Sequence, residues 1–199
     1  MVSIVYTGKY GEIDKEGIHW NDVTLDFSCI TSGEDQNPNR VVRSFVTDTM
    51  LYVFVSEVDL ISWEEAYALY GIRLADGRSN RIPLANPINV CMMDDDTFIV
   101  LEKDSDRYSF ITYRIHNNIS KAFAIDTSKL LSSWTVGGLA YDPISKAVYV
   151  CTNDRVMRGI EGNNLSVCGF ISCDSMLEES AAFINNGTYF LYTVDHLYA

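Results

Sequence analysis

The sequence predicts an all-β fold built from repeated four-stranded antiparallel sheets. Its clearest unit is the stretch 136–171, in which four short β-prone segments read VGGLAYD, AVYVCTN, RVMRGIE and LSVCGFI. Proline presets φ for a turn, and Asn, Asp and Gly tolerate the positive φ of tight hairpins. Such residues separate the four segments: Asp142-Pro143, Asn153-Asp154 and Gly162-Asn163-Asn164. A four-stranded meander of about 35 to 45 residues is one blade of a β-propeller.

The same unit recurs along the chain. The second strand of the unit has counterparts whose central residues are Tyr52, Ile99, Tyr149 and Phe190, at steps of 47, 50 and 41 residues. Propeller blades repeat at a spacing of roughly 40 to 50 residues. About four blades are therefore visible, near 41–85, 87–125, 136–171 and 178–199, together with N-terminal strands in 1–30. We predict a single β-propeller domain over residues 1–199, or a fragment of a propeller.

Short β-prone segments bounded by turn signals define the strands of each blade, and the segment 23–30 alternates apolar and polar residues. In the N-terminal part we expect strands at 2–8, 18–20 and 23–30, followed by a polar loop at 31–40. The next two blades are expected to use strands 41–47, 50–56, 67–74 and 81–85, and then 88–93, 97–102, 107–115 and 121–125. The last blade has strands at 178–185 and 188–194 and the beginning of a third at 196–199.

The incomplete last blade leaves two ways to finish the fold. The N-terminal strands can join the last blade and close a ring, which protects the edge strands of a propeller. Alternatively, the sequence is a piece of a propeller with about six to eight blades. We favour the fragment, because a ring of four blades is at the low end of the usual range. A fragment exposes blade faces and tends to self-associate.

The charge of the chain argues against one class of partner. Its 27 acidic and 15 basic residues give a net charge of −12, which repels phosphate backbones and anionic membrane surfaces. The sequence has no apolar run of about 18 residues, and its N-terminus lacks the basic and apolar segments of a secretory signal. We expect no nucleic-acid partner and no membrane insertion. The chain is expected to be either intracellular or part of a larger extracellular protein.

No sequence motif supports catalysis, nucleotide binding or a cofactor. The sequence has no G-x-S-x-G turn, and we expect His19, His116 and His196 to be structural because no motif supports a catalytic role for them. The acidic turn 94–96 lacks the spacing, glycine and closing glutamate of a calcium loop, so we expect it to be solvated. The five cysteines are odd in number and form no CxxC pair, so we favour buried thiols over a disulfide or a metal site. We therefore predict no catalytic, cofactor-binding or metal-binding residues.

The stretch 57–66, EVDLISWEEA, is the candidate partner-binding loop. It is longer than a tight turn, can hold one helical turn, and places Trp63, Glu64 and Glu65 between the second and third strands of a blade. Long loops on a propeller project from one face, and exposed apolar residues in such loops bind partners. The alternative, which we favour for Trp63 itself, is that the indole packs down against its own blade, because aromatic side chains are mostly buried.

Three N-x-[ST] triplets mark candidate glycosylation sites at Asn118, Asn164 and Asn186. Glycosylation of these asparagines would require export of the protein. A chain of this composition holds about two such triplets by chance, so the triplets are weak evidence for export.

The blade at 136–171 resembles the repeat of YWTD propellers of the low-density-lipoprotein-receptor type, and also the related NHL repeats. The matching segments are GLAYD at 138–142 and AVYVCTNDRV at 147–156. Val150 holds the tryptophan position of the repeat, Cys151 is an extra residue, and Asn153 replaces the aspartate. The resemblance implies a scaffold whose loop-bearing face holds protein ligands. Some related propellers are metal-dependent lactone hydrolases.

The leading functional hypothesis is therefore a β-propeller scaffold for protein–protein interaction, without catalytic activity. The alternative is a small, lactonase-like hydrolase that holds a divalent cation in the channel of the propeller. A third hypothesis is a structural domain that self-associates. The sequence does not identify the protein partner.

Overall fold

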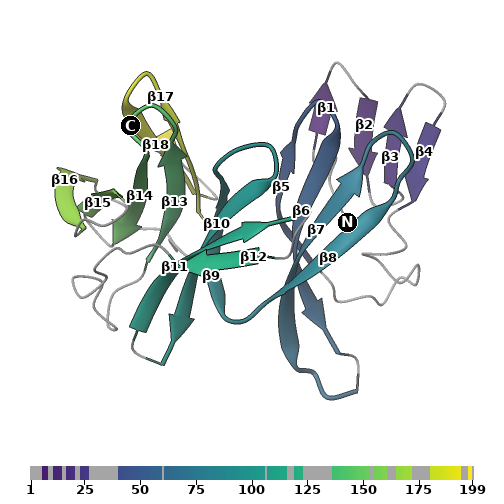
Figure 1. Ribbon diagram of the computed structural model, residues 1–199, viewed down its shortest axis with the longest axis horizontal. Coiled ribbons are helices and arrows are strands. Elements are labelled where there is room, and N and C mark those ends of the chain that lie inside the picture. Colours follow the sequence, from purple (N-terminus) through teal and green to yellow (C-terminus); the bar gives the residue numbers. More distant parts are fainter. Residues whose placement is uncertain are drawn as a thin grey trace. The chain divides into compact units, whose positions relative to one another are not determined.

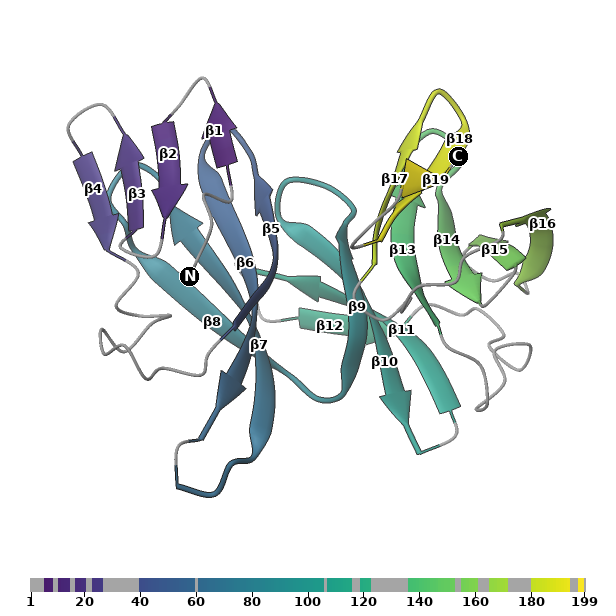
Figure 2. The same ribbon diagram turned by 180° about the vertical axis from the view of Figure 1, so that it is seen from behind.

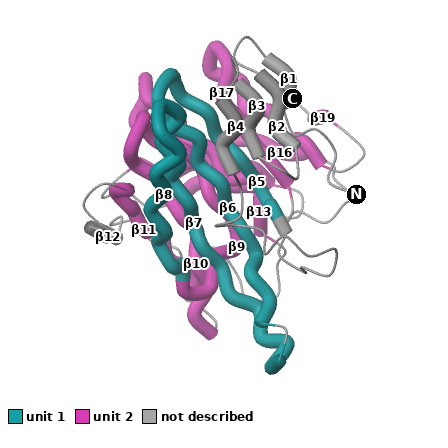
Figure 3. The backbone as a smooth tube through the Cα atoms, turned by 90° about the vertical axis from the view of Figure 1, so that its right-hand side faces the viewer, with its two compact units in different colours: residues 1–84 teal, residues 85–199 magenta. Residues whose placement is uncertain are grey.

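The computed structural model consists of antiparallel β-sheets (Figure 1). The chain divides into two compact units, Met1–Leu84 and Ala85–Ala199 (Figure 3), and each is described by itself. In the described part of the chain, no helix has the length and hydropathy to span a bilayer. The described residues are 6–8, 11–14, 17–20, 23–26, 40–59, 61–105, 107–115, 119–122, 136–152, 155–160, 165–171, 180–193 and 197–198.

The first unit contains two four-stranded sheets in which each strand pairs with the next along the chain. One sheet consists of β1 (Tyr6–Gly8), β2 (Gly11–Asp14), β3 (Gly17–Trp20) and β4 (Val23–Asp26). The other consists of β5 (Arg40–Val46), β6 (Met50–Val58), β7 (Glu65–Arg73) and β8 (Ser79–Leu84). Strands that are consecutive along the chain are also neighbours in each sheet, so the chain runs up and down within a sheet without crossing over.

Both faces of β6 are buried. On one face, Val53 and Val55 belong to a core cluster with Tyr70 and other residues of β7. On the other face, Tyr52 and Phe54 are also almost fully inaccessible. A strand that is covered on both sides reads as a continuous apolar run rather than as an alternating one, which explains the sequence LYVFV.

The second unit contains three sheets. The first has β9 (Pro87–Met92), β10 (Thr97–Asp104), β11 (Arg107–Arg114) and β12 (Ile119–Ala122). The second has β13 (Val136–Asp142), β14 (Ala147–Thr152), β15 (Arg155–Ile160) and β16 (Ser166–Phe170). The third has β17 (Ala181–Asn185), β18 (Thr188–Tyr192) and β19 (Leu197–Tyr198). The first strands of the three sheets lie side by side, with β13 between β9 and β17 (Figure 2).

The main core of the second unit lies between the sheets β9–β12 and β13–β16. Alternate residues of β10, Ile99 and Leu101, share one apolar cluster with Val148 and Val150 of β14. Because side chains alternate between the faces of a strand, this contact uses one face of each sheet. The cluster is completed by Cys91, Tyr108, Phe110, Val136, Leu139, Met157 and Leu165.

The contact between the sheets β13–β16 and β17–β19 combines apolar and polar interactions. Cys151 and Leu191 form its buried centre. The phenol of Tyr189 donates a hydrogen bond to the carbonyl oxygen of Gly138, and its ring stacks on that of Tyr149 at a centroid distance of 6.1 Å. These contacts join β18 to both β13 and β14.

The sequence-based prediction of an all-β chain of four-stranded antiparallel sheets is confirmed, and most strand boundaries agree within one or two residues. The strand β2 was not predicted. The loop predicted at 57–66 is shorter than expected, because β6 continues to Val58 and β7 begins at Glu65. The N–H of Trp63 donates to the carbonyl oxygen of Asp59, which is the hydrogen bond of a single helical turn.

The cysteine prediction is correct only in part. Cys91 and Cys151 are buried, as predicted. Cys168 is instead exposed on β16, which contradicts the buried-thiol prediction for this residue. It lies on the outermost strand of its sheet, whose side chains are largely accessible. Cys29 and Cys173 lie outside the described residues.

We predict that Gly138→Ala destabilises the second unit strongly. Gly138 has φ of +59° at an irregularity in the β13–β14 pairing, and an added Cβ would overlap Leu191 Cδ1 and Tyr189 Oη. The unfavourable φ and the overpacking together cost about 2–4 kcal/mol of unfolding free energy, measured by denaturant titration.

Gly187→Ala is the matched control for this prediction. Gly187 also has a positive φ, +76°, but no atom lies within 4 Å of the position its Cβ would take. Only the backbone strain remains, so we expect a cost of about 1 kcal/mol. Equal costs for the two variants would show that the β13–β18 contact does not constrain position 138.

Candidate functional site

The β6–β7 hairpin extends beyond the two strands that flank it. The pairing of β5 with β6 reaches Ser56, and the pairing of β8 with β7 reaches Tyr67. Beyond these residues β6 and β7 form two more pairs, Glu57↔Ala66 and Val58↔Glu65. The hairpin therefore projects from its sheet as a two-stranded ribbon (Figure 1). We call residues 59–64 at its end the hairpin tip; Leu60 lies outside the described residues.

Asp59 fixes the conformation of the hairpin tip. Its carboxylate accepts hydrogen bonds from the backbone N–H groups of Ile61 and Ser62, both at 2.8 Å. Its carbonyl oxygen accepts the N–H of Trp63 at 2.8 Å, and its own N–H donates to the carbonyl oxygen of Glu64 at 3.0 Å. The backbone hydrogen bonds from Ser62 and Ile61 lower the pKa of the Asp59 carboxyl. Such an Asx turn holds the tip in one conformation.

The hairpin tip presents two large apolar side chains to solvent. Ile61 is 93% exposed and Trp63 is 71% exposed. The prediction that Trp63 packs against its own blade is therefore wrong. Trp63 also has φ of +59°, in the left-handed region that bulky residues rarely adopt. This backbone conformation accompanies the outward position of the side chain.

The two glutamates that were predicted with Trp63 differ in position. Glu64 is exposed at the hairpin tip. Glu65 is instead the first residue of β7, where its carboxylate accepts a hydrogen bond from the hydroxyl of Ser56. The structure thus places Trp63 and Glu64 at the tip and Glu65 at its base. Sequence reasoning missed Ile61, although an apolar residue in a polar loop is a signal for it.

A network of three side chains joins the strands at the root of the hairpin. The guanidinium of Arg81 on β8 donates two hydrogen bonds to the two carboxylate oxygens of Glu57 on β6. The phenol of Tyr70 on β7 donates to the same carboxylate. The hydrogen bonds from Arg81 are the main reason why the pKa of Glu57 is lowered. Burial, followed by the neighbouring Glu57 carboxylate, raises the pKa of Tyr70 to about 12.

The candidate glycosylation sites are only partly described. Asn186 is exposed and has φ of +50° in the turn between β17 and β18. Asn118 and Asn164 lie outside the described residues. Glycosylation remains a prediction for all three.

Among the described residues, no three or more His, Cys, Asp or Glu side chains are close enough to hold a metal ion. In the acidic turn at 94–96, the Asp94 carboxylate accepts the N–H of Asp96, whose own carboxylate accepts the Thr97 hydroxyl. These are local turn contacts. The side chains of His19, His116 and His196 lie outside the described residues.

We predict that Glu57→Gln removes part of the acid sensitivity of the fold. The lowered pKa of Glu57 means that its contribution to stability is present above pH 4.5 and is lost as pH falls through the native pKa. Arg81 is 43% exposed, so solvent screening limits this contribution to about 1 kcal/mol. Unfolding free energies between neutral and acidic pH test this prediction.

The control is Glu64→Gln, which removes an exposed glutamate from the same hairpin. We expect the pH dependence of this variant to match that of the wild type more closely than that of Glu57→Gln. If the two variants lose the same pH dependence, the Glu57–Arg81 contact does not stabilise the folded state.

We also predict that Asp59→Ala loosens the hairpin tip. The substitution removes the acceptor for the N–H groups of Ile61 and Ser62, so these amides should exchange with solvent at least about tenfold faster. Hydrogen exchange followed by NMR measures this effect. Asp76→Ala, in the turn after β7, is the control and should leave the exchange of both amides unchanged.

Comparisons with known proteins give little further information. No family model matches the chain, and no curated protein matches it. One similar solved structure is described as "the extracellular domain of the putative hybrid two component system BT4673 from B. thetaiotaomicron". It is 12% identical over 99% of this chain, with a TM-score of 0.42, and the chain spans 34% of its length. A likeness at this level does not bear on function.

Proposed function

We propose that this chain is a protein-binding module of β-propeller type, and that the hairpin tip contacts its protein partner. The observation on which the proposal rests is the exposure of Ile61 and Trp63 on a projecting hairpin whose conformation is fixed by Asp59. Large exposed apolar residues on monomeric surfaces mark interaction sites when they are grouped.

The succession of sheets supports the propeller part of the proposal. Four of the five sheets in the described chain have four consecutive antiparallel strands, which is the composition of a propeller blade. In the second unit, the first strands β9, β13 and β17 lie side by side, as the inner strands of neighbouring blades do. The resemblance of 136–171 to YWTD and NHL repeats agrees with this interpretation. In propellers, loops between strands carry the ligand-binding residues.

The energetics of the hairpin tip favour a binding role for Trp63. A bulky residue with a left-handed φ costs about 1–3 kcal/mol, and the exposed side chain recovers little of it by packing. Trp is enriched among the residues that dominate binding energy at interfaces. Because the tip is held by hydrogen bonds before any partner arrives, little conformational entropy is lost on binding.

The charges near the hairpin tip indicate the kind of partner surface. Asp59 and Glu64 lie within the tip, and Glu57 and Glu65 lie at its base. An apolar pair surrounded by carboxylates is complementary to an apolar pocket with a basic rim. The net charge of −12 would increase the association rate with such a partner at low salt.

We predict that Trp63→Asn weakens partner binding without loss of stability. Asn tolerates the left-handed φ, so the unfolding free energy should be unchanged or rise by up to about 1 kcal/mol. Loss of a central Trp contact costs about 2 kcal/mol or more, which is roughly a 30-fold loss of affinity. Quantitative affinity purification from cells that produce the protein compares the proteins retained by wild type and variant.

Ile144→Asn is the control for surface hydrophobicity. Ile144 is 90% exposed in the turn between β13 and β14, away from the hairpin of the first unit in sequence. A partner that is retained by the wild type and by Ile144→Asn, and lost by Trp63→Asn, supports the proposal. Identical sets of retained proteins for all three chains would rule out a binding role for Trp63.

A further inference from the structure

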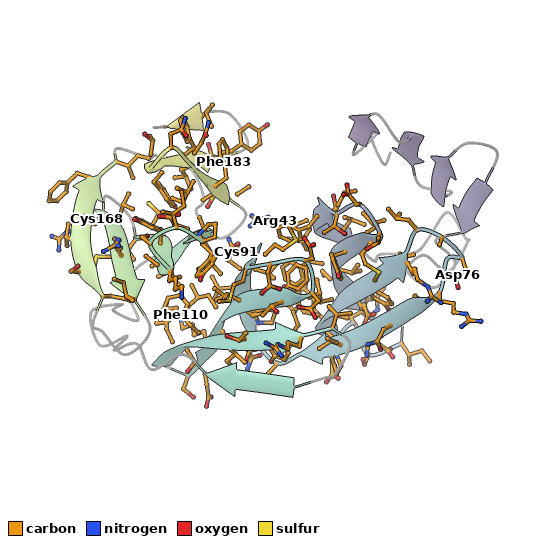
Figure 4. The ribbon with its side chains drawn as sticks, turned by 45° about the horizontal axis from the view of Figure 1, so that its top comes forward. Arg43, Asp76, Cys91, Phe110, Cys168 and Phe183 are labelled. Carbon is orange, nitrogen blue, oxygen red and sulfur yellow. The ribbon has the colours of Figure 1, made fainter. Side chains whose placement is uncertain are left out.

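The sheet β17–β19 has an uncovered apolar face. Tyr189 and Leu191 point toward the sheet β13–β16, where they contact Gly138 and Cys151. Since side chains alternate along a strand, Phe190 points to the opposite face. There it pairs with Phe183 of β17, which is labelled in Figure 4. The rings of Phe183 and Phe190 stack at a centroid distance of 5.0 Å.

The same face carries further apolar residues. Tyr192 is directly opposite Ala181 on one side and Leu197 on the other, so all three share the face with Phe183. Phe183 is 48% exposed, Tyr192 is 52% exposed and Leu197 is 60% exposed. A sheet that is apolar on both faces is expected to be covered on both.

The corresponding strands of the other two sheets in the second unit show what kind of contact this face makes. In β10, the third and fifth residues, Ile99 and Leu101, pack on the sheet that follows. In β14, the third and fifth residues, Tyr149 and Cys151, again pack on the sheet that follows.

The third and fifth residues of β18 are Phe190 and Tyr192. Twice in the second unit, the third and fifth residues of a sheet's second strand are covered by residues of the following sheet. The covering residues are the second and fourth residues of that sheet's own second strand. The uncovered face is therefore the continuation of an interface that already occurs twice. What it contacts is expected to be another β-sheet.

We propose that this face binds the same face of a second copy of the chain, forming a symmetric dimer. The described part of the face carries no Asp, Glu, Lys or Arg, so two copies can meet there without like-charge contact despite a net charge of −12 each. The described part of this face offers no opposite charge to a charged partner.

A head-to-tail contact between two copies is less suitable than this symmetric contact. In a head-to-tail contact, the partner copy would have to offer an exposed face formed by the second and fourth residues of the second strand in one of its sheets. In β6, β10 and β14 these residues are Leu51 and Val53, Phe98 and Val100, and Val148 and Val150, and all are buried. A symmetric contact needs only the exposed face itself, and it closes after two copies.

The dimer is expected to be weak. The face has three strands, so it is smaller than the about 800 Å² per partner of a standard interface. Sedimentation velocity of residues 1–199, from low micromolar to high concentration, should show a reversible monomer–dimer equilibrium. Added salt should increase the dimer fraction, because it screens the repulsion between two acidic copies. A chain that stays monomeric throughout, or a dimer that salt dissociates, would overturn the proposal.

Two substitutions test the location of the interface. Phe183→Lys and Tyr192→Lys each place an unpaired charge in the apolar contact, so the dissociation constant should rise at least about tenfold. Ile144→Lys makes the same kind of change at an exposed site outside the face and should leave the equilibrium unchanged. Equal dimerisation of all variants would overturn the proposal. Thermal unfolding verifies that each variant is folded, and Leu197→Lys replaces any variant that is not.

This test is independent of the proposed partner-binding site. Trp63→Asn should dimerise as the wild type does, and Tyr192→Lys should retain any partner of the hairpin tip. Loss of dimerisation in Trp63→Asn would place the contact at the hairpin tip and overturn the proposal for the sheet face.

Discussion

The structure depends on the requirement that each sheet be covered on both faces. In the second unit this requirement is met by one recurring contact between the second strands of neighbouring sheets. The third and fifth residues of one second strand pack on the second and fourth residues of the second strand in the following sheet. The contact explains why the second to fifth residues of β10, β14 and β18 are all apolar or aromatic. It also places the first strands β9, β13 and β17 side by side, because each sheet packs directly on the one before it.

Polar groups fix the register of these sheet-to-sheet contacts. The phenol of Tyr189 reaches the carbonyl of Gly138, and the amide of Asn89 donates to the carbonyl of Ser180 at 3.0 Å. Ser180 and Asn89 are almost fully buried, so the hydrogen bond between them replaces one that each group would make with water. Apolar contacts tolerate small shifts between sheets, whereas these hydrogen bonds do not. Gly138 contributes to the same contact, because a side chain at this position would separate the sheet β13–β16 from the sheet β17–β19.

The strands were predictable from the sequence because they depend on local information. Turn residues such as Asp142 and Gly187, and the continuous apolar runs at 51–55 and 147–151, determine where strands begin and end. The strand β2 was missed because GEID offers only one apolar side chain, and its pairing with β1 and β3 is not a property of its own residues. The extension of β6 to Val58 was missed for a similar reason. The sequence of the hairpin contains both strand and turn signals, and the pairing with β7 decides between them.

The candidate site was harder to predict than the fold, because it depends on where side chains point. General burial statistics favoured an inward position for Trp63, but the hydrogen bonds around Asp59 give it a left-handed φ and an exposed side chain. The Glu57–Tyr70–Arg81 network joins three strands and has no signature in the sequence.

The two exposed apolar surfaces differ in ways that suit different partners. The hairpin tip is narrow, fixed by its own hydrogen bonds and surrounded by carboxylates, so it suits insertion into an apolar pocket with a basic rim. The face of β17–β19 extends over three strands, has no charged residues in its described part, and carries the strand positions that make a sheet-to-sheet contact elsewhere in the unit. A neutral, apolar face gains most from another face of the same kind, because shape complementarity and apolar burial are then its main sources of affinity. The two surfaces belong to different compact units.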